Sequence, residues 1–267
     1  MHNYLLNYLV FLSSRIHSSR IVINMTGTKA DIIDQLKKEL LPMQGFKYLL
    51  KNNALDRALG PITNAFPQAT FPLGSIHEFL AMGPEDAAST AGFVGGILSS
   101  LMQNHGTAIW VSANRTIFPP ALQAWGIAPH KMIFIDLKKE KEILWVMEEA
   151  LKCGGLSAVI GEMRELSFTA SRRLQLAVEQ SKVTGFVLRE QPRSVAATAC
   201  VSRWKITSLP SELLGNMPGV GFSRWNVELL KVRNGKPGSW QIEFGANGFR
   251  QVSRLAAIVL AQQKKTG

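Results

Sequence analysis

The sequence has little cysteine and no apolar run long enough to cross a membrane. Only Cys153 and Cys200 occur among 267 residues, and neither lies in a CxxC motif or beside a histidine at ligand spacing. This argues against a disulfide framework and against a zinc site. The apolar run at residues 4–12 is far shorter than the roughly 20 residues of a membrane span. We therefore expect a protein of the reducing cytoplasm with no membrane partner.

Acidic residues are scarce in the C-terminal part of the chain. Residues 1–150 hold 13 basic and 12 acidic side chains, whereas residues 151–267 hold 17 and 7. A basic half of this kind indicates a polyanionic partner, with nucleic acid first. A solvated basic surface that aids solubility accounts for the same charge, and both interpretations stay open. The hydrophobic content of 46% excludes a disordered chain.

The N-terminal third is expected to lie outside the main domain. Residues 1–24 are interpreted as a disordered tail or as an extension from an upstream start, because Met25 opens a well-formed start. Residues 25–69 are expected to form one helix and a linker, and the Pro-, Gly- and Asn-rich stretch 51–74 to form turns. The helix follows from apolar residues at helical spacing, which are Ile32, Ile33, Leu36 and Leu40. It packs on its own core or docks on a partner.

Residues 70–250 alternate short apolar strands with helices. The expected strands are 76–80, 108–111, 132–135, 157–160 and 184–188, and the expected helices are 90–104, 118–125, 140–151 and 169–181. Strands that are apolar on both faces and separated by helices predict a parallel sheet covered on both sides. After residue 196 the stretches 198–206, 225–233 and 240–244 have no helix between them, which predicts an antiparallel extension ending in a hairpin. Residues 251–267 are expected to form a tail.

A motif follows the first strand. The segment Gly83-Pro84-Glu85-Asp86-Ala87-Ala88-Ser89-Thr90 resembles the phosphate loop of RecA-type ATPases, whose form is Gly-Pro-Glu-x-x-Gly-Lys-Thr. Ala88 and Ser89 stand where that loop needs glycine for backbone approach and lysine for phosphate charge. We therefore expect a vestigial nucleotide loop over residues 83–89. Its candidate residues are Gly83, Pro84, Glu85, Ser89 and Thr90.

Two further positions depart from the same ATPase pattern. Asn114 stands where the family has the acid that activates water, and Gly161 stands where it has the aspartate that orients magnesium. Glu162 comes one place later and points to the opposite face of its strand. Three losses together predict a RecA-like scaffold that hydrolyses no ATP and needs no cofactor or metal.

Downstream segments carry a second resemblance. Residues 172–189, the strand 198–206 with Arg203-Trp204-Lys205, and the stretch 225–235 resemble the ImuA-type error-prone repair proteins. The likeness covers about residues 70–250. It implies an SOS-linked accessory factor of mutagenic translesion synthesis. The implied partners are an ImuB-like Y-family polymerase relative, a C-family error-prone polymerase and RecA.

Two alternatives stay open beside this resemblance. The division inhibitor SulA shares the scaffold and also lacks ATP chemistry, so a SulA-like division inhibitor is one. A RecA-type ATP-dependent DNA-binding protein is the other.

Several basic residues are candidates for weak DNA binding. The connections 164–170 and 189–194 match the places where RecA proteins carry mobile DNA-binding loops. A basic rim built there would contact phosphates, unless its arginines pair with Glu162, Glu165 or Glu190. The candidates are Arg164, Arg172, Arg173, Arg189, Arg193, Arg203 and Lys205. Trp204, Trp225 and Trp240 either stack on bases or pack in the core of the C-terminal strands.

Overall fold

The computed structural model describes residues 52–103, 106–113, 117–211, 221–245 and 248–252. The expected N-terminal helix, the tail 1–24, Asn114 and nearly all of the C-terminal tail lie outside these ranges. No helix within them is long and apolar enough to cross a membrane.

The described residues build one nine-stranded sheet in the order β3-β2-β4-β5-β1-β6-β7-β8-β9. Strands β1 to β6 pair in parallel, whereas β6–β7, β7–β8 and β8–β9 pair antiparallel. The strands are β1 Ile76–Ala81, β2 Thr107–Ser112, β3 Met132–Asp136, β4 Leu156–Met163, β5 Thr184–Glu190, β6 Ser202–Leu209, β7 Ser223–Val232, β8 Gly238–Gly245 and β9 Gly248–Gln251. The predicted parallel sheet with an antiparallel C-terminal extension is confirmed. The prediction that the antiparallel part begins with the strand at 198–206 was wrong. That strand, β6, pairs in parallel with β1, and the antiparallel part begins at β7.

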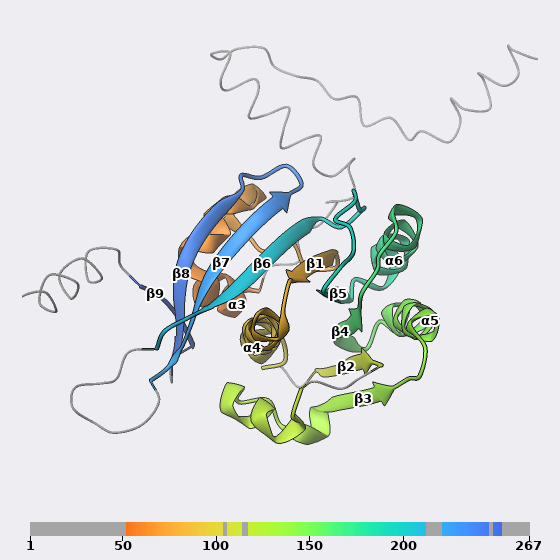
Figure 1. Cartoon of the computed structure of the whole chain (residues 1–267), viewed down its shortest axis with the longest axis horizontal. Helices are drawn as coiled ribbons and strands as arrows, with labels where there is room; N and C mark the ends of the chain where they lie inside the picture. Colours follow the sequence, from red (N-terminus) through yellow and green to blue (C-terminus); the bar gives the residue numbers. More distant parts are fainter. Residues whose placement is uncertain (1–51, 104–105, 114–116, 212–220, 246–247, 253–267) are drawn as a thin grey trace, which may run out of the picture. The chain divides into compact units, whose positions relative to one another are not determined.

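Helices lie on both faces of the sheet. The α-helices are α3 Asn53–Leu59, α4 Pro84–Leu101, α5 Glu140–Leu151 and α6 Phe168–Ser181. The 3-10 helices are η2 Gly60–Ala65, η3 Pro67–Ala69, η4 Pro119–Trp125 and η5 Pro129–Lys131. Figure 1 shows α5 and α6 together on one side, with α4 across the sheet from them and α3 behind β7 and β8.

Two hydrophobic clusters result, one on each face. The larger joins α3, α4 and η4 to the sheet and contains the buried rings of Phe79, Phe93 and Trp204. Trp204 stacks on Phe79 with ring centroids 5.9 Å apart. The smaller cluster lies under α5 and α6. Trp204 and Trp225 are buried and Trp240 packs against the same cluster, so the C-terminal tryptophans are core residues.

Residues 52–69 belong to this core, which corrects the interpretation of 51–74 as a linker with turns. Asn52 caps α3, since its side chain accepts hydrogen bonds from the N–H groups of Ala54 and Leu55. Leu55, Leu59 and Ile62 are fully buried in the larger cluster. Spacings of four and three residues place these side chains on one side of the segment, and this outweighs its loop-like composition.

His77 is a buried histidine on β1. Its Nδ1 lies 2.6 Å from Ser202 Oγ and its Nε2 lies 2.9 Å from the carbonyl oxygen of Pro72. Burial lowers the pKa of His77 from its ordinary 6.5 to about 4, against the opposing effect of the Pro72 hydrogen bond. The ring is therefore neutral in the folded protein near pH 7.

This pKa predicts acid destabilisation. The unfolded chain takes up a proton at His77 near pH 6.5 and the folded chain only near pH 4. The free energy of unfolding therefore falls as pH drops from 6.5 to 4, by about 3 kcal/mol in all. Urea unfolding between pH 7 and 4.5 measures the slope. His77→Gln is expected to flatten it, whereas substituting the exposed His130 leaves it unchanged. Equal slopes in wild type and His77→Gln would contradict the assignment of this pH dependence to His77.

Candidate functional site

The segment expected to be a nucleotide loop is helical. Helix α4 begins at Pro84 with Gly83 as its N-cap, so only Met82 and Gly83 separate it from β1. The expected loop over residues 83–89 and helix start near residue 90 are therefore wrong. Proline suits the first helical position, and Ala88 favours helix at the position where the ATPase loop needs glycine.

Acidic residues occupy the start of this helix. Glu85 and Asp86 lie in its first turn, and Asp86 Oδ2 accepts a hydrogen bond from the Met82 N–H at 3.1 Å. These carboxylates already complement the positive end of the helix dipole, where a phosphate would otherwise bind. Ser89 and Thr90 are 7% and 1% exposed, and they face the interior of the protein.

A cleft of about 390 Å³ lies beside the start of α4. It is lined by Gly83, Pro84, Ala87, Ala88, Ala91, Glu190 and Gln191. No cation is among these lining residues, and burial raises the pKa of Glu190 against the opposing charge of Arg164. A carboxylate and small apolar groups offer nothing that neutralises a triphosphate.

The position at which the ATPase family has its magnesium-orienting aspartate also differs in this chain. Gly161 lies inside β4, and a Cβ built there would come 2.6 Å from Met147 Sδ. Glu162 points to the other face, where its Oε1 accepts a hydrogen bond from Trp110 Nε1 at 2.7 Å. The described residues contain no cluster of His, Cys, Asp or Glu that could hold a metal ion.

Glu78 is the buried charge that sequence reasoning missed. It lies on β1 with no exposed surface. Its Oε1 accepts from Arg189 Nη1 at 2.8 Å, and its Oε2 accepts from Arg203 Nε and Thr198 Oγ1, each at 2.8 Å. The sequence did carry a signal for this network, which is a glutamate within the apolar strand IHEFLA. A charge buried in such a strand needs oppositely charged or hydrogen-bonding partners.

The same arginines hold the connection between β5 and β6. Arg189 Nη2 donates to the Ser194 carbonyl at 2.9 Å, and Arg203 Nη2 donates to the Ala196 carbonyl at 2.6 Å. Arg189 is only 1% exposed and also pairs with Glu165 at 3.3 Å. Its assignment as a DNA contact in a loop is therefore corrected, because it lies on β5 and faces inward.

The remaining candidates do not form one basic rim. Arg164 and Arg193 are exposed, but both line a cleft of about 300 Å³. Four glutamates line the same cleft, namely Glu140, Glu162, Glu165 and Glu190. Arg172 and Arg173 lie on α6, where Arg173 pairs with Glu148 of α5 at 2.6 Å. Lys205 lies apart from them on β6.

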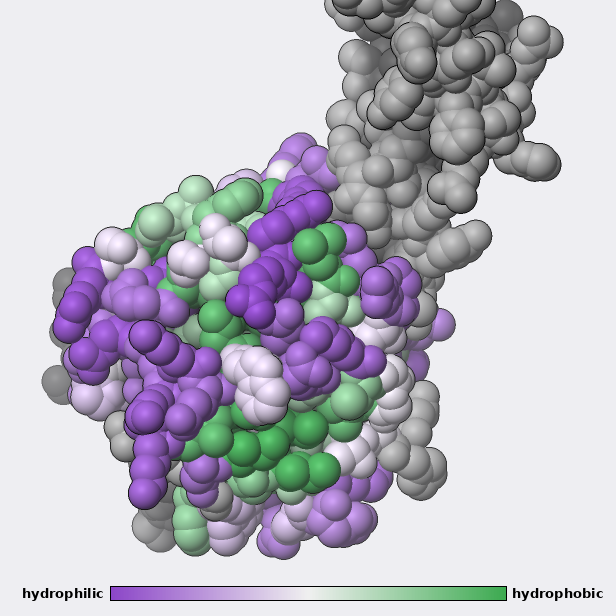
Figure 2. Space-filling model, turned by 90° about the vertical axis from the view of Figure 1, so that its right-hand side faces the viewer, coloured by the Kyte–Doolittle hydropathy of each residue, from purple (hydrophilic) through white to green (hydrophobic). Residues whose placement is uncertain are grey.

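The outer side of α5 and α6 is mixed rather than basic. Together these two helices carry five acidic and three basic residues. Figure 2 shows this side of the molecule, with hydrophobic patches between hydrophilic ones. Exposed apolar residues here include Trp145, Phe168 and Leu176 at 62%, 58% and 47%. The charge of this side does not favour DNA.

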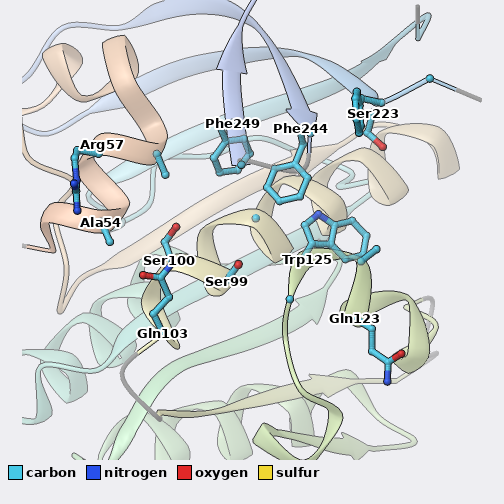
Figure 3. Close-up of a pocket in the computed structure, with 18 residues that line it drawn as sticks. Ala54, Arg57, Ser99, Ser100, Gln103, Gln123, Trp125, Ser223, Phe244 and Phe249 are labelled. Carbon is cyan, nitrogen blue, oxygen red and sulfur yellow. The ribbon is translucent and has the colours of Figure 1, made fainter. Parts of the chain in front are cut away.

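A groove of about 1070 Å³ lies between α3, α4, η4 and the ends of β7, β8 and β9. Figure 3 shows Trp125, Phe244 and Phe249 close together on one side of it, with Ser99 and Ser100 on α4 and Gln103 just after that helix. The rings approach α4 at its glycines, and a Cβ on Gly96 would lie 2.4 Å from Phe249 Cζ. The lining contains no carboxylate, histidine or cysteine, so the groove offers no acid–base chemistry.

The Glu78 network generates a stability prediction. Glu78→Gln leaves Arg189 and Arg203 buried beside a neutral amide, so the free energy of unfolding is expected to fall by about 3–5 kcal/mol. The control is Glu149→Gln on α5, because the ion pair of Glu149 with Lys152 is exposed to solvent. Its loss is expected to lower the free energy of unfolding far less. Urea unfolding measures both. Equal losses in the two variants would show that the network is not a stability determinant.

Comparisons with known proteins support the resemblance to ImuA-type proteins. The chain is 35% identical to Protein ImuA of Caulobacter vibrioides strain NA1000 over 212 residues, which cover 73% of this chain and 87% of the relative. Protein ImuA of a second strain, ATCC 19089, matches to the same extent. No family model matches the chain.

Similarity to a second group is shorter. The chain is 26% identical to the cell division inhibitor SulA of Edwardsiella piscicida over 103 residues, covering 39% of this chain and 61% of that protein. The crystal structure of SulA from Pseudomonas aeruginosa superposes with a TM-score of 0.37 at 18% identity, covering 43% of this chain and 97% of that one. The extent and identity of the first match decide between the two groups: this chain belongs to the ImuA family.

Proposed function

We propose that this chain is a non-hydrolysing, RecA-like accessory protein of SOS-induced mutagenic translesion DNA synthesis. In this role it scaffolds an ImuB-like Y-family polymerase relative, modulates RecA, or does both, together with a C-family error-prone polymerase. The observation that carries the proposal is the 35% identity with Protein ImuA across 87% of that relative.

The geometry at the end of β1 supports a role without catalysis. Helix α4 starts two residues after the strand, carboxylates fill its first turn, and the adjacent cleft is lined by no cation. ATP hydrolysis by this scaffold needs a lysine and a metal clamp around the phosphates. These features also argue against a RecA-type motor.

A SulA-like division inhibitor is the second candidate, favoured by the 103-residue similarity to SulA. That similarity covers only 39% of the chain, about half of what the ImuA similarity covers. The excess of basic residues after residue 150 also fits a role beside DNA better than binding to a tubulin-like ring protein.

The first prediction of this proposal is the absence of ATP turnover. Purified protein with magnesium ATP and single-stranded DNA is expected to release phosphate at the rate of a blank reaction, with RecA as the positive control. Turnover in the wild type that disappears in Thr90→Ala would refute the proposal, because it would assign catalysis to the start of α4. Equilibrium nucleotide binding on the same samples tests for residual affinity.

The second prediction concerns partners. Affinity capture of the tagged chain from DNA-damaged cells is expected to recover an ImuB-like polymerase or RecA, and nuclease treatment removes proteins that are bridged only by DNA. The control is capture with the tag alone. Recovery of only the division-ring protein would replace the proposal with the SulA-like alternative.

A further inference from the structure

The outward face of β6, β7, β8 and β9 is a polar sheet surface that no described helix covers. Trp204, Trp225 and Ile242 of these strands point into the larger core cluster. Because side chains alternate along a strand, their neighbours point to the opposite face. In Figure 1, α3 lies behind these strands, and no described helix lies in front of β6, β7 and β8. We call this outward surface the polar face.

Cations outnumber anions on the polar face. Among the described residues, its charged side chains are the five cations Arg203, Lys205, Arg224, Lys231 and Arg250 and the two anions Glu228 and Glu243. Arg203 is paired with the buried Glu78, which leaves four cations to the surface. Arg203 opposes Lys231, and Glu243 lies between Arg224 and Arg250, so the register places all of them on one side. A surface with this balance attracts a polyanion.

The two carboxylates leave part of the positive charge unbalanced. Glu228 lies directly opposite Lys205 in the register of β6 and β7. Glu243 accepts from Arg224 Nε and from Arg250 Nη2, each at 2.6 Å, so one carboxylate serves two arginines. The side chain of Arg250 remains 72% exposed. Lys231 is exposed, and its Nζ donates to the neutral carbonyl of Thr198 at 3.1 Å. Positive charge therefore stays accessible at β7 and β9.

The chemistry of the polar face indicates contact with phosphates and not with bases. The tryptophans of β6, β7 and β8 all pack on the opposite side, so they offer no stacking platform for unpaired bases. Thr207, Asn226 and Gln241 lie between the cations and add neutral hydrogen-bonding groups. Such donors position a protein on the nucleic-acid backbone without reading sequence.

We infer that the polar face binds the phosphate backbone of duplex DNA, independent of sequence, through Lys205, Lys231 and Arg250. From β6 to β9 there are three strand steps, roughly 14 Å, comparable with the major groove width of about 12 Å. Duplex DNA carries the higher charge density, so it is favoured over a single strand. The inference rests on the proposed function, because a role in DNA-damage tolerance supplies this polyanion.

The test compares two triple variants that lose the same charge. The polar-face variant is Lys205→Gln, Lys231→Gln and Arg250→Gln, and the control on the α5 and α6 side is Lys141→Gln, Lys152→Gln and Arg172→Gln. Fluorescence anisotropy with a labelled 20-base-pair duplex measures affinity from 50 to 200 mM salt. Thermal unfolding of each variant verifies that it is folded.

The wild type and the control are expected to bind alike and to prefer duplex over a single strand of the same length. The polar-face variant is expected to lose the salt dependence of about three phosphate contacts. Between 50 and 200 mM salt its affinity should therefore fall about 40-fold less than that of the wild type.

A wild-type salt slope in the polar-face variant, an equal loss in the control, or tighter binding of single strands would overturn the inference. If the wild type binds no DNA at 50 mM salt while the polymerase partner is captured, the inference fails and the proposed function stands.

Discussion

The buried carboxylate of Glu78 is the constraint on which the middle of the sheet depends. It pairs with one arginine from β5 and one from β6, the two strands that flank β1. A parallel connection from β5 to β6 must cross β1, and such crossovers usually contain a helix. Here residues 191–201 cross without one, and Arg189 and Arg203 bind the carbonyls of Ser194 and Ala196. Hydrogen bonds from the two arginines that pair with Glu78 therefore hold a connection that contains no helix.

Helix α4 provides the matching constraint on the other face. Its glycines at 92, 95 and 96 let the rings of Trp125, Trp225 and Phe249 approach the helix closely, and a Cβ at any of them would lie 3.2 Å or less from a ring atom. These contacts join α4 to η4 and to the antiparallel strands β7 and β9. A helix that starts directly after β1 and is held along its length by aromatic rings leaves no loop free to wrap a phosphate.

The sequence was sufficient to predict elements whose pattern of apolar residues is local. Alternation of apolar runs predicted β1 to β5, and α5 has the bounds that its apolar spacing predicted. It was insufficient where partners are distant: Glu78 lies 111 residues from Arg189, so no spacing rule shows that the arginine is buried. Composition misled at residues 52–69, where proline and glycine sit beside leucines that pack in the core. The loop expected at residues 83–89 followed from family likeness, whereas the residues present there form the first turns of α4.

The three residues Arg203-Trp204-Lys205, which carried part of the family resemblance, have three different roles. Trp204 enters the larger core cluster, while strand alternation places its two neighbours on the other face. Arg203 lies beside Glu78 at the centre of the sheet and is mostly buried, so its charge is used inside the protein. Lys205 is one alternation further along the same face, past the buried carboxylate, and is partly exposed. A single motif therefore supplies packing, an internal ion pair and an accessible cation.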